Sequence, residues 1–150
     1  MTYTFRKLNQ KEAEEIAYTW HYEGDYSFYD MEADEEDLEE FLDEEKRGDN
    51  TYAVFNDEEL VGFFSWTYKG EEAYISLGLR PDRTGRGEGR TFLDACLVFL
   101  NASVVTLDVA AFNKRAIRLY ENAGFQEIYR FPQKTNGGTY SFVHMRKITS

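Results

Sequence analysis

The chain has one cysteine, no long apolar run and few basic residues. The single cysteine, Cys96, cannot form a disulfide within the chain, which is typical of a protein in a reducing cytoplasm. No apolar run approaches the roughly 20 residues that a helix needs to cross a bilayer. The first ten residues, MTYTFRKLNQ, lack the apolar core of a signal peptide. We therefore expect a cytoplasmic protein with no membrane partner.

The scarcity of cations argues against a general nucleic-acid binder. The chain has 17 Lys and Arg against 28 Asp and Glu, and its formal net charge is -11, whereas phosphate contacts need clustered cations. The balance is uneven, because residues 80–118 contain seven cations and only four acids. A local basic stretch in an acidic chain suits an anionic small ligand and a cationic or neutral second partner.

Apolar and aromatic residues are plentiful enough for a packed core. Hydrophobic residues make up 42% of the 150 positions, with 12 Phe and 11 Tyr. Alternation predicts strands at 3–7, 52–55, 60–68, 73–79, 104–110, 125–131 and 140–146. Helical spacing predicts helices at 11–20, 34–45, 87–100 and 114–123. Since neither repeats nor low-complexity tracts interrupt this order, we expect one mixed α/β domain over residues 1–150.

Two further signals concern turns and glycines. Residues 56–59 and 136–138 have the composition of tight turns between strands. Gly78 lies inside a predicted strand, where glycine marks a bulge or a close approach to another backbone.

A glycine-rich loop links a predicted strand to a predicted helix. Gly85, Gly87 and Gly89 alternate with Arg86 and Glu88. Backbone N–H groups at such a helix start favour a negative group, so the loop indicates a phosphate-bearing ligand. No lysine follows these glycines as a Walker A loop requires, and the third glycine of a dinucleotide fingerprint is replaced by an arginine. A glycine turn without a ligand is the alternative.

A second segment, residues 109–125, is a helix with a clear start and end. Asn113 is a favourable N-cap, and Gly124 is a favourable residue after the helix. Asn113, Ala116 and Tyr120 fall on one face, with Asn113 and Tyr120 roughly 10 Å apart. Taken singly, Asn113 is read as a cap and Tyr120 as a half-buried aromatic.

Together the two segments resemble the GNAT family of acyl-CoA-dependent N-acetyltransferases. The stretch from Thr84 to Gly89 falls on the family's Arg/Gln-x-x-Gly-x-Gly/Ala loop. The family's later pattern, Asn-x-x-Ala-x-x-Leu/Phe-Tyr-x-x-x-Gly-Phe, is matched by Asn113, Ala116, Leu119, Tyr120, Gly124 and Phe125. The order and spacing agree over residues 3–147. The resemblance implies a mostly antiparallel sheet of six to seven strands, flanked by about four helices and splayed between the strands ending near Leu79 and Ala110.

The resemblance also implies acetyl-CoA as co-substrate and no metal. Its pantetheine arm would pair with backbone around Leu77 and Leu79, and backbone N–H groups from Gly85 to Arg90 would hold its pyrophosphate. Tyr120 would protonate the departing CoA thiolate. The implied cofactor-binding set is Leu77, Leu79, Thr84, Gly85, Arg86, Gly87, Glu88, Gly89, Arg90, Asn113, Ala116 and Tyr120.

Two positions depart from the family pattern. Thr84 replaces the usual Arg or Gln and removes one long polar contact to the phosphates, for which Arg83 or Arg86 would compensate. Glu88 replaces an apolar residue, and an anion there weakens pyrophosphate binding unless it points away. We expect ordinary or slightly weak CoA affinity.

The general base is not evident, because the strand at 73–79 contains no acid. Glu23 is our catalytic candidate. The alternatives are Glu72 or a water relayed by Tyr22, Tyr26, Tyr29 or Ser76. His21 is interpreted as a surface residue at a helix end, His144 as structural and Cys96 as an inert core thiol.

The acceptor pocket is expected in the aromatic segment after the first helix. Its candidate substrate-binding residues, which would hold an alkylammonium by cation–π contact, are Trp20, Tyr22, Tyr26 and Tyr29. The alternative is a loop whose aromatics only pack over the sheet.

The predicted function is transfer of an acetyl group from acetyl-CoA to a primary amine by direct attack in a ternary complex. A non-catalytic acyl-CoA-binding module, another acyl-CoA and a hydroxyl acceptor are the alternatives. The acceptor, the acyl length and the choice between monomer and homodimer stay open.

Overall fold

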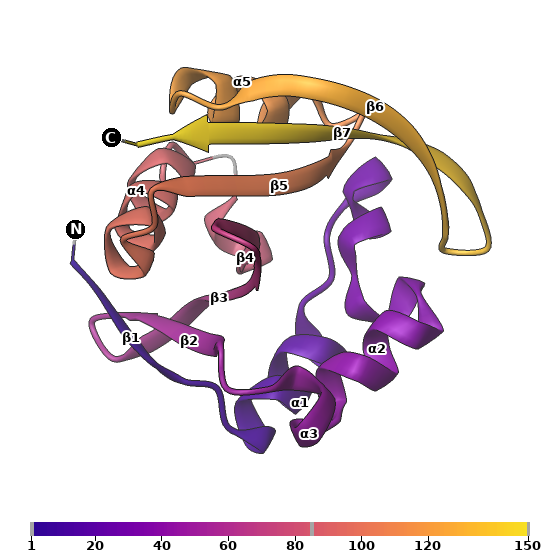
Figure 1. Ribbon diagram of the computed structural model, residues 1–150. Helices are drawn as coiled ribbons and strands as arrows, with labels where there is room; N and C mark the ends of the chain where they lie inside the picture. The colour runs from indigo at the N-terminus through magenta and orange to yellow at the C-terminus, as the bar shows by residue number, and fades with distance from the viewer. Residues whose placement is uncertain (1, 85, 150) are drawn as a thin grey trace. The chain divides into compact units, whose positions relative to one another are not determined.

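The computed structural model describes residues 2–84 and 86–149, which include a seven-stranded sheet (Figure 1). The strand order is β1-β2-β3-β4-β5-β7-β6. The strands are β1 (Tyr3–Lys7), β2 (Thr51–Asn56), β3 (Glu59–Lys69), β4 (Glu72–Leu79), β5 (Val104–Ala110), β6 (Gln126–Thr135) and β7 (Gly138–Ile148). β4 pairs with β5 in parallel, whereas β1–β2, β2–β3, β5–β7 and β6–β7 are antiparallel. The predicted mixed α/β fold, with a mostly antiparallel sheet of six to seven strands, is confirmed.

Five α-helices accompany the sheet within the described residues, where about four were expected. They are α1 (Gln10–Thr19), α2 (Glu35–Leu42), α3 (Glu44–Arg47), α4 (Gly89–Leu100) and α5 (Lys114–Asn122). The helix predicted at 34–45 is divided, because Asp43 ends α2 and its side chain accepts a 2.9 Å hydrogen bond from the backbone N–H of Glu45. A short polar side chain favours such a cap over the interior of a helix. The irregular segment that follows α1 forms two short 3₁₀ helices, η1 (Gly24–Tyr29) and η2 (Met31–Ala33), and η3 (Pro81–Arg83) follows β4.

Side chains cap most of these helices at their N-termini. Asn9, Asp34 and Asp43 cap α1, α2 and α3. The predicted cap of α5 is confirmed, since Oδ1 of Asn113 accepts a 3.1 Å hydrogen bond from the N–H of Ala116. Of the α-helices within residues 2–84 and 86–149, α4 is the one that begins without a side-chain cap. Its first N–H groups therefore lack both an intrahelical acceptor and a capping side chain.

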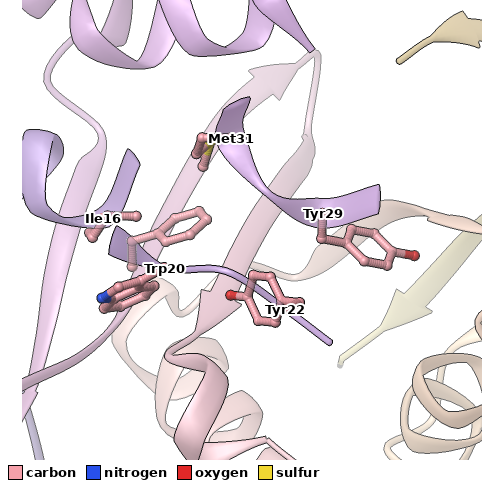
Figure 2. A pocket seen from close by; sticks show the side chains of 6 residues that line it. Ile16, Trp20, Tyr22, Tyr29 and Met31 are labelled. Carbon is pink, nitrogen blue, oxygen red and sulfur yellow. The ribbon is translucent and has the colours of Figure 1, made fainter. Parts of the chain in front are cut away.

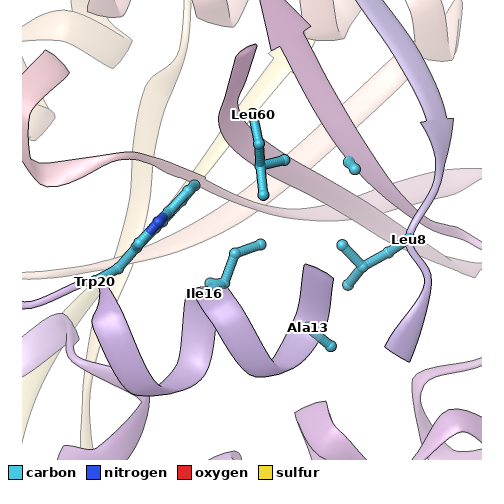
Figure 3. Close-up of a cluster of buried hydrophobic side chains, with 6 residues drawn as sticks. Leu8, Ala13, Ile16, Trp20 and Leu60 are labelled. Atoms are coloured by element: carbon cyan, nitrogen blue, oxygen red, sulfur yellow. The ribbon is translucent and has the colours of Figure 1, made fainter. Parts of the chain in front are cut away.

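The chain forms two compact units, and β3 and β4 each contribute to both. The first unit runs to Ser65 and adds Leu77–Arg86, while the second contains Trp66–Ser76 and the chain from Gly87 on. In the first unit, α1 packs its apolar face on β2 and β3 (Figure 3). That core cluster consists of Leu8, Ala13, Ile16, Trp20, Ala53 and Leu60.

The second unit places β5, β7 and β6 side by side (Figure 1). Val105, Leu107 and Val109 are buried along one face of β5, as the alternation of a strand requires. Cys96 of α4 is fully buried, and burial raises the pKa of its thiol, so its interpretation as a core residue is confirmed.

Gly78 allows a close approach, but not the one expected from the sequence. A Cβ at this position would lie 2.7 Å from Cζ of Phe63 and nearer still to Cε1. The neighbour is thus an aromatic ring and not a backbone. The turn after β2 has positive φ at Asp57 (52°) and Glu58 (67°), which confirms a tight turn whose twist suits a hairpin.

Candidate active site

The parallel pairing between β4 and β5 is short. It joins Glu72 to Val104, Ala73 to Val105 and Tyr74 to Thr106, although β4 continues to Leu79 and β5 to Ala110. The ladder thus covers only the first residues of β4 and of β5, and the splay between the strand ends stays a prediction. The main-chain groups beyond this ladder are the ones that the sequence analysis assigned to the pantetheine arm.

The loop after β4 uses most of its polar groups locally. The Thr84 hydroxyl donates to the Pro81 carbonyl oxygen at 2.7 Å, so it does not extend from the loop as an arginine would. Arg83 donates to Glu59 at 3.0 Å and is largely buried. Arg86 is exposed, with Nη1 3.3 Å from the Asp82 carbonyl oxygen. Of the two arginines expected to compensate for Thr84, Arg86 is the exposed one.

The backbone and packing at the start of α4 explain why Gly87 and Gly89 are glycines. Gly87 has φ +78° with open space around it, so a left-handed backbone and not crowding calls for glycine there. A Cβ on Gly89 would lie 3.3 Å from Cδ2 of Leu119, so glycine allows α4 to pack closely on α5. Gly85 lies outside the described residues.

Glu88 is buried, and Arg90 uses its side chain within the second unit. Glu88 is only 8% exposed, and its backbone carbonyl accepts the Phe92 N–H at 2.9 Å. Its carboxylate is thus placed in the interior and not on the outer surface of the loop. Arg90 pairs with Asp94 at 3.0 Å and donates to the Asn122 carbonyl at 3.0 Å, which ties α4 to the end of α5. What Arg90 can offer an anion is its backbone N–H.

The three residues predicted on one face of α5 differ in burial. Asn113 is buried, while Ala116 and Tyr120 are half-buried. The Tyr120 ring contacts Phe125 edge-on, with ring centroids 5.7 Å apart. This contact fixes the ring, and the role of its hydroxyl stays a prediction.

Side chains of the aromatic segment line a small pocket of about 10 Å³, which lies entirely within the first unit (Figure 2). Three of the four predicted acceptor residues, Trp20, Tyr22 and Tyr29, line it, whereas Tyr26 does not. The other lining residues are Ile16, Met31 and Phe63. Trp20 is 4% exposed and its ring lies 6.5 Å from that of Phe63, so Trp20 serves the core as well.

Tyr22 is held at both ends. Its hydroxyl donates a 2.7 Å hydrogen bond to the Leu79 carbonyl oxygen, and its N–H donates to Asp30 at 2.8 Å. Burial raises the pKa of the Tyr22 hydroxyl, so it stays protonated. Asp30 also lies 3.2 Å from Nδ1 of His21, and this contact raises the pKa of that exposed histidine. His21 is at the surface as predicted, while the part played by Asp30 was not foreseen.

The candidate general bases, Glu23 and Glu72, differ in their surroundings. Glu23 is exposed at the start of η1. Glu72 sits at the opposite end of β4 from Leu79 and pairs with Arg146 at 3.3 Å.

Sequence reasoning missed a contact between Asp108 and His144, whose Oδ1 and Nδ1 are 2.7 Å apart. The available signal was a carboxylate between the apolar residues of the strand at 104–110.

No group of three or more His, Cys, Asp and Glu side chains in the described part of the chain is arranged to hold a metal ion. None of the helices there is both long enough and apolar enough to cross a membrane.

Comparison with known proteins identifies the class to which this fold and these motifs belong. The model of the Acetyltransferase (GNAT) family matches residues 13–125, and the chain therefore belongs to that family. It is 37% identical over 79 residues to mycothiol acetyltransferase of Propionibacterium freudenreichii subsp. shermanii, over 46% of this chain and 25% of that protein. It is 40% identical over 53 residues to N-alpha-acetyltransferase RimI of Mycobacterium tuberculosis, over 35% of this chain and 34% of that protein. The chain thus spans a quarter to a third of these relatives.

The fold is shared with solved acetyltransferases. Spermidine N-acetyltransferase from Vibrio cholerae, solved in complex with CoA and spermine, superposes with a TM-score of 0.72. The alignment covers 98% of this chain and 95% of that one at 22% identity, a likeness that establishes the fold.

Proposed function

We propose that the protein transfers an acetyl group from acetyl-CoA to a primary amine. The observation that carries this proposal is the uncapped start of α4 directly after the glycine loop, in a chain of the GNAT family. Free N–H groups at a helix start, together with the helix dipole, favour a pyrophosphate. The left-handed backbone at Gly87 and the exposed Arg86 add support.

We infer a cationic amine acceptor from the aromatic residues around the pocket. Trp20, Tyr22 and Tyr29 line this pocket, and aromatic rings attract an alkylammonium. Asp25 and Asp30 lie in the same acidic segment and favour a cation by charge. The Vibrio cholerae enzyme, crystallised with spermine, makes polyamines the first acceptors to try.

In the proposed chemistry the amine attacks the thioester carbon directly. A C–N bond forms, the C–S bond breaks, and Tyr120 donates its phenolic proton to the departing thiolate. A phenol of pKa about 10 can donate to a thiolate whose conjugate acid lies near 8.5 if the site holds the two close together. A backbone N–H on β4 would polarise the thioester oxygen. Asn113 would contact the cofactor arm beside Tyr120.

A non-catalytic acyl-CoA-binding module is the second candidate, favoured by Thr84, whose hydroxyl is turned back to Pro81. A different acyl-CoA or a hydroxyl acceptor would keep the same fold and site.

The test measures release of the CoA thiol from acetyl-CoA with polyamines, peptide N-termini, lysine analogues and aminoglycosides as acceptors. We expect turnover with at least one cationic amine and a drop of about 10²-fold or more in kcat for Tyr120→Phe. Tyr18→Phe, a change at an exposed tyrosine, is the matched control. Acetyl-CoA binding without thiol release for any acceptor would support the binding module, and equal rates for Tyr120→Phe and wild type would remove Tyr120 from the mechanism.

A further inference from the structure

A three-residue polar cluster lies on the sheet of the second unit, apart from the residues assigned so far. Asp108 of β5 is at its centre, with Oδ1 2.7 Å from Nδ1 of His144 on β7. Its other oxygen, Oδ2, accepts a 2.8 Å hydrogen bond from the hydroxyl of Tyr74 on β4. Asp108 and His144 are direct cross-strand partners, and their side chains are 19% and 17% exposed. Both oxygens of a largely buried carboxylate are therefore engaged, which keeps the carboxylate in place.

The cluster holds the imidazole of His144 in one orientation. Tyr129 of β6 stacks on the ring, with centroids 4.7 Å apart and planes 17° from parallel. Since a carboxylate only accepts hydrogen bonds, its contact with Nδ1 assigns the proton of the neutral ring to Nδ1. Nε2 makes no hydrogen bond to any residue that the structure describes. An imidazole with Nδ1–H on a carboxylate and a lone pair open on Nε2 is the arrangement of a general base.

The position of the cluster links it to the reacting groups. Tyr74 and Thr106 form the last parallel pair between β4 and β5, and Asp108 follows just beyond it. Leu107 and Val109 are buried on one face of β5, so Asp108 projects to the other face. β5 then runs on to the turn that leads to Asn113 and α5, which carries Tyr120. The cluster thus lies just beyond the last parallel pair, on the strand that leads to α5 and Tyr120.

We propose that His144, oriented by Asp108, is the general base of the acetyl transfer. This inference rests on the proposed function. Nε2 takes a proton from the acceptor's ammonium, directly or through one water, and the neutral amine attacks the thioester carbon. After the C–S bond breaks, Tyr120 supplies the thiolate's proton. The second proton that the nitrogen loses as the amide forms returns through solvent to the Tyr120 phenolate. The sum is ammonium plus acetyl-CoA giving amide, CoA thiol and one proton, which His144 passes to solvent.

The charged and titratable groups around His144 affect the pH dependence expected of this base. Lys69 of β3 lies 5.0 Å above the Tyr74 ring, and the pair of Glu72 with Arg146 is the next ionic contact along the sheet. The titratable or charged groups from neighbouring strands are therefore Lys69, Glu72, Tyr74, Asp108, Tyr129 and Arg146. Asp108 is the carboxylate that contacts the imidazole directly.

The experiment compares wild type with His144→Gln, His144→Ala and Asp108→Asn, using the best amine from the acceptor panel. We expect His144→Gln to lower kcat/KM for the amine by about 10²-fold or more near neutral pH. The loss should shrink as the pH rises and the free amine becomes abundant, and added imidazole should partly restore His144→Ala. Asp108→Asn should lower the rate by about 10-fold or more, because the amide no longer favours the Nδ1–H tautomer. Arg146→Gln, which breaks the neighbouring ion pair, is the matched control and should stay within about twofold.

The controls separate the two proposals. Urea unfolding and CoA affinity should show that the variants fold and bind. If wild type transfers acetyl groups and His144→Gln keeps both its rate and its pH profile, this inference is overturned while the proposed function stands. If wild type transfers none to any amine, both are overturned. Should His144→Gln fail to fold, an unchanged pH profile in Asp108→Asn overturns the inference just as well.

Discussion

The hydroxyl of Tyr22 donates a 2.7 Å hydrogen bond to the carbonyl oxygen of Leu79, 57 residues further along the chain. The backbone N–H of Arg80 donates a 2.7 Å hydrogen bond to the carbonyl oxygen of Val61 on β3. Because successive residues of a strand point their N–H and C=O groups to opposite sides, the Leu79 carbonyl faces away from β3. Tyr22 thus occupies the edge of β4 that the GNAT resemblance assigns to the pantetheine arm, and it also lines the aromatic pocket.

Tyr22→Phe should weaken the fold and the binding of the acceptor. The change removes one hydrogen bond to a carbonyl, which costs about 1 kcal/mol of unfolding free energy. The ring is then no longer held as a wall of the pocket, so KM for the amine should rise several-fold. Urea unfolding and steady-state kinetics measure the two effects, with Tyr18→Phe as the exposed control. An unchanged KM would argue against this pocket as the acceptor site.

Gly78→Ala should destabilise the first unit, because the new methyl group would overlap the Phe63 ring. Overpacking of this kind costs about 1–3 kcal/mol. Phe63→Leu in the same chain should recover part of the loss, and a double-mutant cycle in urea isolates the coupling. Ser76→Ala, an exposed change in the same strand, should have little effect. Purely additive single changes would contradict a steric origin.

His21 should titrate above its ordinary pKa of 6.5, mainly because of its hydrogen bond with Asp30. A pKa raised in the folded state means that the protonated ring favours folding. The stabilisation is complete below about pH 6.5 and is lost as the pH rises through the folded pKa. NMR titration of the imidazole Cε1–H signal measures this shift, and Asp30→Asn should bring the pKa back down. His144→Gln assigns the two histidine signals, and a His21 pKa insensitive to Asp30→Asn would contradict the contact.

Thr84→Gln should strengthen binding of acetyl-CoA. The Thr84 hydroxyl donates its hydrogen bond to the Pro81 carbonyl oxygen. A glutamine, one of the family's usual long polar side chains here, would reach the phosphates instead. A several-fold lower KM for acetyl-CoA is expected, with kcat little changed, because one hydrogen bond to a charged group is added. Thr84→Val, which loses the hydroxyl and gains no reach, separates the two effects. An equal KM in both variants would mean that this position does not face the phosphates.

Local sequence was enough to locate the elements whose pattern is strong. The strand at 104–110 agrees with β5 to the residue, since its apolar, β-branched sequence is typical of a strand and five of its seven residues are buried. Asn113 was recognisable as the cap of α5 because a cap depends on residues a few positions apart. The acidic segment at 34–45 was harder, because Asp43 is both compatible with a helix and well suited to end one.

The sequence by itself determined the family, the glycine loop and the residues that begin and end the helices, because each depends on neighbours along the chain. Only the tertiary structure decided which side chains meet. Asp108 and His144 face each other through the register of β5 with β7, and Tyr74 joins them through the short parallel ladder. Tyr22 reaches Leu79 because α1 packs on β2 and β3 through a shared core. Such contacts depend on strand pairing and packing between distant segments, which no local pattern specifies.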